Sequence, residues 1–222
     1  MAGIAEKLQL TRARIRRTPG VILLAVSKGQ PIERIREAVD AGQKAFGENY
    51  VQEAVQKMQL IPSSSPALEW HLIGPLQSNK TRVVAERFDW VQTLASEKIA
   101  RRLSEQRPAH LPPLNVLIQV NVSGEASKSG VGVPEVEKLA RTIAALPNLR
   151  LRGLMAIPEP GADRSRYGAV KELFDKLKGE FAFDTLSMGM SDDLEIALAE
   201  GATMVRIGTA IFGARKSEKD AA

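Results

Sequence analysis

The sequence contains no cysteine, which excludes a disulfide framework, a thiol nucleophile and a metal site with thiolate ligands. It has only two histidines, His71 and His110, so a histidine-rich metal centre is not indicated either. Aromatic residues make up only 5% of the chain and form no basic-aromatic run, and the net charge of +5 is spread along it. We therefore expect no bound metal and no nucleic-acid partner, and interpret the charge as solubility together with attraction for an anionic ligand.

Long apolar runs are lacking as well. No stretch approaches the roughly 20 apolar residues that a membrane-spanning helix requires, so we expect no contact with a membrane. Residues 1–20 are basic but contain no apolar segment of the kind that a secretory signal has. Ile4, Leu8 and Ile15 instead have the spacing of an amphipathic first helix, and we expect a cytoplasmic protein.

Short apolar runs alternate with longer helical patterns along the rest of the sequence. The predicted strands lie within Val21–Gln30 and at Lys44–Glu48, Trp70–Gly74, Trp90–Leu94, Leu114–Val122, Leu151–Ile157, Asp184–Met188 and Met204–Gly208. The predicted helices lie at Ile32–Ala41, Val51–Gln59, Lys80–Arg87, from Ser96 to just before Pro108, and at Pro134–Leu146, Arg166–Lys178 and Asp192–Glu200, with a last helical turn after the eighth strand.

Eight strands that alternate with helices predict parallel pairing through right-handed crossovers. Eight is also the number that closes a (β/α)8 TIM barrel, and 222 residues lie within the size range of that fold. No Pro/Ser-rich stretch is long enough to be an interdomain linker, so the predicted fold class is α/β with a single domain. A doubly wound open sheet is the alternative, but the first strand is followed by no Gly-x-Gly-x-x-Gly motif of the dinucleotide-binding kind.

The first predicted strand ends at a lysine. Its uninterrupted aliphatic run is typical of a strand buried on both faces, and it stops at Lys28, before Gly29 and Pro31. Burial lowers the pKa of a lysine, and the neutral amine attacks carbonyl carbons to form Schiff bases. Lys28 is therefore a candidate Schiff-base lysine; the alternative is a side chain that turns out to solvent at the strand end.

Loops with glycine and hydroxyl residues follow the last two strands, where TIM barrels often bind phosphate. In Ser187–Asp193, we expect Ser191 or Asp192 to cap the next helix, and Asp192 and Glu195 have the spacing of a capping box. The eighth strand ends in Arg206–Thr209, which supplies a glycine and a threonine. Backbone N–H groups and hydroxyls in both loops favour an anion; the alternative is a routine capped helix and a routine glycine turn.

Arg206 stands between apolar residues inside the eighth strand. A buried guanidinium needs an acceptor, because an unpaired buried charge is costly. One acceptor would be a carboxylate from a neighbouring strand end. The other would be a pyridine nitrogen, which an always-protonated arginine would keep unprotonated. The sequence leaves both open.

Two further polar sites are interpreted as structural. His71, on the third strand, is expected to be a barrel-core histidine with a satisfied hydrogen bond. The loop that contains Lys128 and Ser129 is expected to be solvated, with reach toward an anionic ligand as its alternative role.

Six segments together form a recognisable set: Leu24–Lys28, Phe46–Glu53, Trp70–Lys80, Gly153–Ile157, Leu186–Asp193 and Val205–Gly213. In this order they resemble the pyridoxal phosphate homeostasis protein family, the YggS/PROSC group, and the resemblance covers nearly the whole chain. It implies a barrel like the N-terminal domain of alanine racemase, the type III fold of pyridoxal phosphate enzymes. It also implies pyridoxal 5′-phosphate (PLP) as the cofactor, held as a Schiff base on Lys28, and a role in vitamin B6 balance with no established catalytic turnover.

The cofactor-binding residues that the resemblance implies are Lys28, Asn49, Ser187, Ser191, Arg206, Gly208 and Thr209. Ser191, Gly208 and Thr209 would contact the phosphate, with Ser187 as a helper. No residue is assigned a catalytic role. Residues 1–222 would form one PLP-binding domain, with an N-terminal helix and loop at 1–20 and a polar tail at 216–222.

Two of these residues carry a particular role. Arg206 falls where alanine racemase places the arginine that faces the pyridine nitrogen. Asn49 resembles a residue that lines the cofactor pocket, and its alternative role is the N-cap of the helix at Val51–Gln59, with Glu53 four residues further on.

We expect a protein that binds PLP and buffers or delivers it, with PLP-dependent apo-enzymes as candidate partners. The alternative is a PLP-dependent amino-acid racemase, which needs a second acid/base, commonly a tyrosine that the resembled racemase takes from a second domain and a partner subunit. The printed sequence ends soon after the eighth strand, and its two tyrosines, Tyr50 and Tyr167, lie on or beside predicted helices. We therefore expect that domain to be absent and the protein to be a monomer. A cofactor-free Schiff-base aldolase would want its lysine on a middle strand, whereas Lys28 lies on the first.

Overall fold

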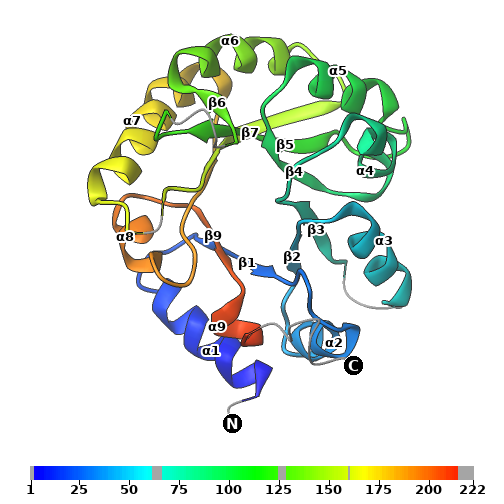
Figure 1. Ribbon diagram of the computed structural model, residues 1–222, viewed down its shortest axis with the longest axis vertical. Helices are drawn as coiled ribbons and strands as arrows, with labels where there is room; N and C mark the ends of the chain where they lie inside the picture. Colours follow the sequence, from blue (N-terminus) through cyan, green and yellow to red (C-terminus); the bar gives the residue numbers. More distant parts are fainter. Residues whose placement is uncertain (1–2, 62–66, 125–128, 160, 215–222) are drawn as a thin grey trace.

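The parallel strands close into a barrel (Figure 1). The computed structural model describes residues 3–61, 67–124, 129–159 and 161–214. In ring order the barrel strands are β1 (Ile22–Val26), β2 (Ala45–Glu48), β3 (Glu69–Leu72), β4 (Trp90–Leu94), β5 (Leu114–Asn121), β7 (Leu149–Ala156), β8 (Thr185–Ser187) and β9 (Met204–Ile207). β9 pairs with β1 and β4 pairs with β5, which completes the ring. The two-residue strand β6 (Val131–Gly132) pairs with β5 beside it. The predicted (β/α)8 barrel is confirmed, and the open doubly wound sheet is wrong.

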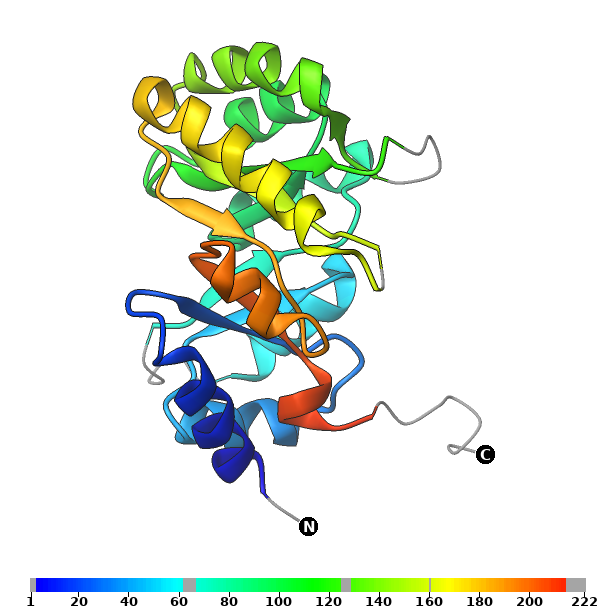
Figure 2. The same cartoon turned by 90° about the vertical axis from the view of Figure 1, so that its left-hand side faces the viewer.

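Helices surround the barrel on its outside (Figures 1 and 2). They are α1 (Ile4–Ile15), α2 (Ile32–Asp40), α3 (Val51–Leu60), α4 (Thr81–Arg87), which follows the 3-10 turn η1 (Ser78–Lys80), α5 (Glu97–Gln106), α6 (Val133–Ala144), α7 (Arg164–Phe181), α8 (Leu194–Ala199) and α9 (Thr209–Phe212). Each lies close to its predicted range. α9 is only four residues long, and α1 packs against both α2 and α9.

The barrel interior mixes apolar and polar side chains. Two small apolar clusters lie inside it, one of Leu24, Ala45 and Met204 and one of Trp90, Leu117 and Met155. Fully or almost fully buried polar side chains come from β3, β4, β8 and β9; they are His71, Gln92, Ser187 and Arg206. Buried polar groups need hydrogen-bond partners, so these four are expected to satisfy one another.

None of the helices in the described ranges is long and apolar enough to cross a membrane. In the same ranges, His, Cys, Asp and Glu side chains nowhere gather in a group of three or more that could hold a metal ion. Lys128 and the tail at 216–222, for which predictions were made above, lie outside the described residues.

Candidate functional site

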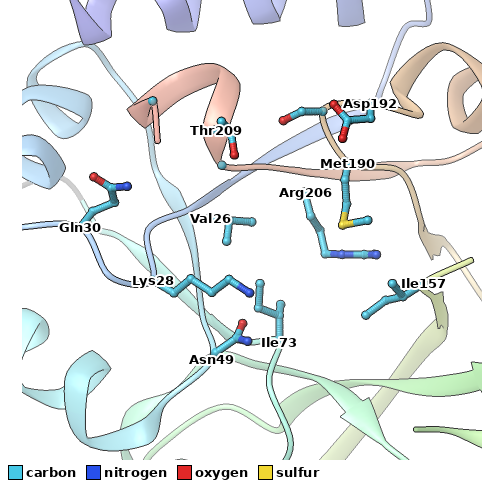
Figure 3. Close-up of a pocket in the computed structure, with 13 residues that line it drawn as sticks. Val26, Lys28, Gln30, Asn49, Ile73, Ile157, Met190, Asp192, Arg206 and Thr209 are labelled. Atoms are coloured by element: carbon cyan, nitrogen blue, oxygen red, sulfur yellow. The ribbon is translucent and has the colours of Figure 1, made fainter. Parts of the chain in front are cut away.

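A pocket of about 280 Å³ lies at the carboxyl ends of the barrel strands (Figure 3). This is the end at which TIM barrels carry their functional residues. Six of the seven predicted cofactor-binding residues line it: Lys28, Asn49, Ser191, Arg206, Gly208 and Thr209. The seventh, Ser187, is fully buried and does not belong to the lining.

Lys28 follows β1 and is half-buried at the pocket wall. Its side chain extends into the pocket toward the side chains of Ile73 and Arg206 (Figure 3). The alternative of a lysine that turns away into solvent is therefore wrong. The turn at Gly29, with φ of +67°, carries the chain out of the strand and leaves Lys28 at its end.

A buried cluster of charges holds the backbone on both sides of Lys28. Lys57 on α3 donates to the Ser27 carbonyl at 2.7 Å, and the Ser27 hydroxyl donates to Glu48 at 2.6 Å. On the other side, the Gly29 N–H donates to Glu53 at 2.6 Å. The position of the amine is thus fixed by groups that do not themselves line the pocket.

The members of this cluster also pair with one another. Lys57 Nζ lies 2.8 Å from Glu48 and 2.6 Å from Glu53, and the Glu48 side chain is fully buried. Burial raises the pKa of Glu48, and Lys57 opposes this shift. Within the described part of the chain, Glu48 Oε2 has no hydrogen-bond partner. Sequence reasoning missed this cluster; the available signals were the i, i+4 spacing of Glu53 and Lys57 and an acid at the end of a buried strand.

Arg206 lies almost fully buried at the pocket floor. Its Nη1 donates to the Ser187 hydroxyl at 2.8 Å and its Nη2 to the Ala156 carbonyl at 2.9 Å. Burial lowers the pKa of Arg206 to about 10, so the guanidinium remains cationic at neutral pH. Among the described residues, no carboxylate lies within ion-pair distance of it. Of the two acceptors predicted from sequence, the neighbouring carboxylate is therefore absent from this part of the structure.

The loop between β8 and α8 forms another wall of the pocket. Asp193 accepts hydrogen bonds from the Met190 N–H and from the hydroxyl of Tyr167 on α7. Because these bonds hold residues 191–193 in a turn, α8 begins only at Leu194, after Asp193. The predicted caps by Ser191 or Asp192 are therefore wrong. The capping box is also wrong, since Glu195 pairs with Arg14 on α1 instead.

Asn49 follows β2 and lines the pocket. The residue that precedes α3 is Tyr50, and no side chain caps that helix, so the alternative role of Asn49 as an N-cap is wrong. The loop after β3 presses against the Asn49 backbone. A Cβ added to Gly74 would lie 2.2 Å from the Asn49 carbonyl oxygen, so only glycine fits there.

His71 is fully buried in the barrel, as predicted, and its ring stacks on Trp90 with centroids 5.0 Å apart. Its Nδ1 lies 3.0 Å from Gln92 Nε2. Its Nε2 faces a Glu69 carboxylate oxygen at 3.6 Å and has no hydrogen-bond partner in the described ranges. The predicted satisfied hydrogen bond is therefore present at one ring nitrogen only.

The lining includes an amine, a guanidinium, two hydroxyls and two glycines, from the ends of different strands. An amine can hold a carbonyl carbon, whereas hydroxyls and closely approaching backbone can hold an anion. A pocket of about 280 Å³ suits one small ligand. The donor set thus fits a small molecule that combines a carbonyl group, a hydrogen-bond acceptor for arginine and an anionic arm.

The comparisons with known proteins agree with this chemistry. The sequence model of the alanine racemase N-terminal domain matches residues 2–216. A protein of Escherichia coli K12 named pyridoxal phosphate homeostasis protein is 54% identical over 99% of this chain and 97% of its own. A protein of the same name from Pseudomonas aeruginosa is 56% identical, with 97% of each chain covered.

Comparison of the fold with solved structures also finds a PLP-binding protein and an alanine racemase. PipY of Synechococcus elongatus PCC7942 with PLP bound superimposes with a TM-score of 0.86 at 36% identity, covering 95% of this chain and 100% of that one. Alanine racemase from Corynebacterium glutamicum superimposes with a TM-score of 0.72 at 19% identity, covering 97% of this chain and 62% of that one. The latter likeness shows the fold alone.

Proposed function

The chain belongs to the alanine racemase N-terminal domain family and, within it, to the pyridoxal phosphate homeostasis proteins, and from this premise we propose that it binds PLP and balances its intracellular supply. The observation that carries the proposal is the meeting of Lys28 and Arg206 in one pocket with the hydroxyls of Ser191 and Thr209. When bound, PLP supplies an aldehyde, a pyridine nitrogen and a phosphate, and each of these has a matching group there.

Each lining residue has a proposed role toward the cofactor. Lys28 would hold the aldehyde carbon as a Schiff base. Ser191, Gly208 and Thr209 would contact the phosphate. Arg206 would donate to the pyridine nitrogen and, because it remains protonated, keep that nitrogen unprotonated. Asn49 would line the pocket beside the ring.

Ser187 receives a different role from the one that the sequence indicated. Its hydroxyl accepts from Arg206 Nη1 at 2.8 Å and donates to Gln92 Oε1 at 2.7 Å. These bonds support a role in holding Arg206 rather than in contacting the phosphate.

The mouth of the pocket supports a carrier rather than an enzyme that protects a carbanion. Ile157 and Met190 line the pocket and are 44% and 39% exposed, so a bound ligand would be within reach of solvent. Carbanion chemistry needs water to be excluded, whereas release and transfer of a cofactor do not. The open mouth thus favours the carrier. A racemase is the alternative function, and the experiment below distinguishes the carrier from the racemase.

The test is to load the purified protein with PLP and to reduce the complex with borohydride. The proposal expects a yellow protein, a covalent adduct on the peptide that contains Lys28, and loss of both in Lys28→Ala. A protein that binds no PLP would overturn it. A colourless protein that instead traps a sugar phosphate would be an aldolase, and rapid epimerisation of single-enantiomer amino acids by the loaded protein would establish the racemase alternative.

We further propose that PLP-dependent apo-enzymes of the cytoplasm receive the cofactor and that the protein acts as a monomer. Transfer is tested by mixing the loaded protein with an apo-enzyme across a dialysis membrane and in direct contact. Faster activation in direct contact supports hand-over between proteins. Equal rates would contradict it. Sedimentation of the loaded protein tests the monomer, and cell fractionation tests the location.

A further inference from the structure

Four buried polar side chains form one continuous chain of hydrogen bonds across the barrel interior. His71 Nδ1 lies 3.0 Å from Gln92 Nε2, and the Ser187 hydroxyl donates to Gln92 Oε1 at 2.7 Å. Arg206 Nη1 in turn donates to the Ser187 hydroxyl at 2.8 Å. His71, Gln92 and Ser187 are 0% exposed and Arg206 is 4% exposed, so these bonds are shielded from bulk solvent. The chain connects the centre of the barrel with the pocket floor.

Two groups in contact with these side chains indicate which atoms donate and which accept: a guanidinium, which only donates, and a thioether sulphur, which only accepts. A guanidinium only donates, so the Ser187 oxygen accepts from Arg206 Nη1, and its own proton is then available for Gln92 Oε1, 2.7 Å away. A thioether sulphur only accepts, and Met204 Sδ lies 3.1 Å from Gln92 Nε2. Both ends of the Gln92 amide are therefore fixed, with its oxygen toward Ser187 and its nitrogen toward His71.

The orientation of the Gln92 amide also determines which ring nitrogen of His71 carries the proton. Because the Gln92 amide nitrogen donates, His71 Nδ1 accepts, and the proton of the neutral ring is on Nε2, which faces Glu69 at 3.6 Å. Burial lowers the pKa of His71, which keeps the ring neutral and Nδ1 available as an acceptor. His71 thus holds Gln92 in the orientation that Ser187 requires.

We infer that Gln92 is a positioning residue for Arg206, and that His71 acts through it. By accepting the Ser187 proton, Gln92 turns the Ser187 lone pair toward the guanidinium and keeps Arg206 directed at the pocket. Without this amide, the Ser187 hydroxyl is free to turn its proton toward Arg206, and the almost fully buried Nη1 donor then loses its acceptor. The inference rests on the proposed function, because the role of Arg206 toward the pyridine nitrogen is part of it.

The test compares Gln92→Leu with the wild-type protein, using PLP labelled with ¹⁵N in its ring. We expect a changed ¹⁵N chemical shift of the bound cofactor, because the hydrogen bond to its ring nitrogen is altered. We also expect a dissociation constant that rises by roughly tenfold, the effect of one hydrogen bond to a charged group. Gln43→Leu is the matched control, since Gln43 is also buried and hydrogen-bonded but does not belong to the hydrogen bonds that join His71 to Arg206. It should leave the chemical shift unchanged.

The outcomes are distinguishable from one another. If the wild-type protein takes up no PLP, the proposed function fails. If it binds PLP and Gln92→Leu gives the same chemical shift and affinity as Gln43→Leu, the inference about Gln92 is overturned while the proposed function stands. Ser187→Ala is a smaller change that removes the acceptor of Arg206 Nη1 itself, and it should shift the ¹⁵N signal in the same direction even if Gln92→Leu fails to fold.

A double-mutant cycle tests whether His71 acts on Arg206 through Gln92. We expect His71→Phe to move the ¹⁵N signal in the same direction as Gln92→Leu but by less, because it removes only the orientation of the amide. In the Gln92→Leu background, His71→Phe should add nothing further. Additive changes would show that His71 does not act through Gln92.

Discussion

The ammonium group of Lys57 donates a 2.7 Å hydrogen bond to the main-chain carbonyl of Ser27, the residue immediately before Lys28. It uses its other bonds on Glu48 and Glu53, at 2.8 and 2.6 Å. A lysine that is only 6% exposed thus joins helix α3 to the end of β1. The base of the pocket wall that carries Lys28 therefore depends on a buried ion pair rather than on apolar packing alone.

Replacement of Lys57 by methionine should be strongly destabilising. It leaves the fully buried Glu48 without its cation, and breaking a buried ion pair from one side costs about 3–5 kcal/mol. Urea denaturation measures this loss. The double variant Lys57→Met, Glu48→Gln should recover part of it, because no buried charge is then left unpaired. Lys176→Met, at a position 69% exposed, is the control and should change stability by less than about 1 kcal/mol.

Glu48 should make the stability of the folded protein depend on pH with a definite sign. Its pKa is raised above the ordinary value of 4.5 by burial. The unfolded chain therefore loses this proton first as pH rises, and the contribution of Glu48 to stability is fully present below pH 4.5 and declines as pH rises through the raised pKa. The free energy of unfolding of the wild-type protein minus that of Glu48→Gln should thus fall with increasing pH. A difference that instead grows with pH would mean that Lys57 outweighs desolvation and lowers the pKa.

Gly74→Ala should disturb the pocket through Asn49. The added Cβ would lie 2.2 Å from the Asn49 carbonyl oxygen and 2.6 Å from its Cα, so the backbone of one loop must move. We expect a loss of about 1–3 kcal/mol in stability and weaker PLP binding, measured by denaturation and by fluorescence titration. Gly179→Ala is the matched control. Gly179 lies within α7 with nothing within 4 Å of an added Cβ, so alanine there should stabilise the helix by up to about 1 kcal/mol. Equal behaviour of the two variants would contradict the close approach of Gly74 and Asn49.

Local patterns account for what the sequence could predict. The aliphatic run before Lys28 and the loops after the last two strands are contiguous, and a closed barrel brings all strand ends to one face. The Gln92–Ser187 bond joins residues 95 positions apart, and it exists only because ring closure brings β4 and β8 to the same interior. The resemblance implies a phosphate role for Ser187, yet this residue is the last one of β8 and its side chain is fully buried. The hydrogen bond between Tyr167 and Asp193 could not be predicted from the sequence, because the two residues lie 26 positions apart on different elements.

Tyr167→Phe should loosen the loop that carries Ser191. The buried Tyr167 hydroxyl donates to Asp193, whose other oxygen accepts the Met190 N–H, so one carboxylate ties the loop to α7. Burial and Asp193 raise the pKa of Tyr167, so the hydroxyl remains a donor at neutral pH. Loss of this hydrogen bond to a charged acceptor should cost about 1.5–3 kcal/mol in unfolding free energy.

The matched control is Tyr50→Phe, because Tyr50 is 63% exposed and its hydroxyl can exchange partners with water. It should change neither unfolding free energy nor PLP affinity. In Tyr167→Phe the dissociation constant of PLP should rise severalfold, since a phosphate contact from Ser191 requires the loop to be held in place. The two effects are separable by comparing PLP with pyridoxal, which lacks the phosphate. If Tyr167→Phe weakens both ligands equally, the loop does not act at the phosphate end, and the assignment of Ser191 to that end is wrong.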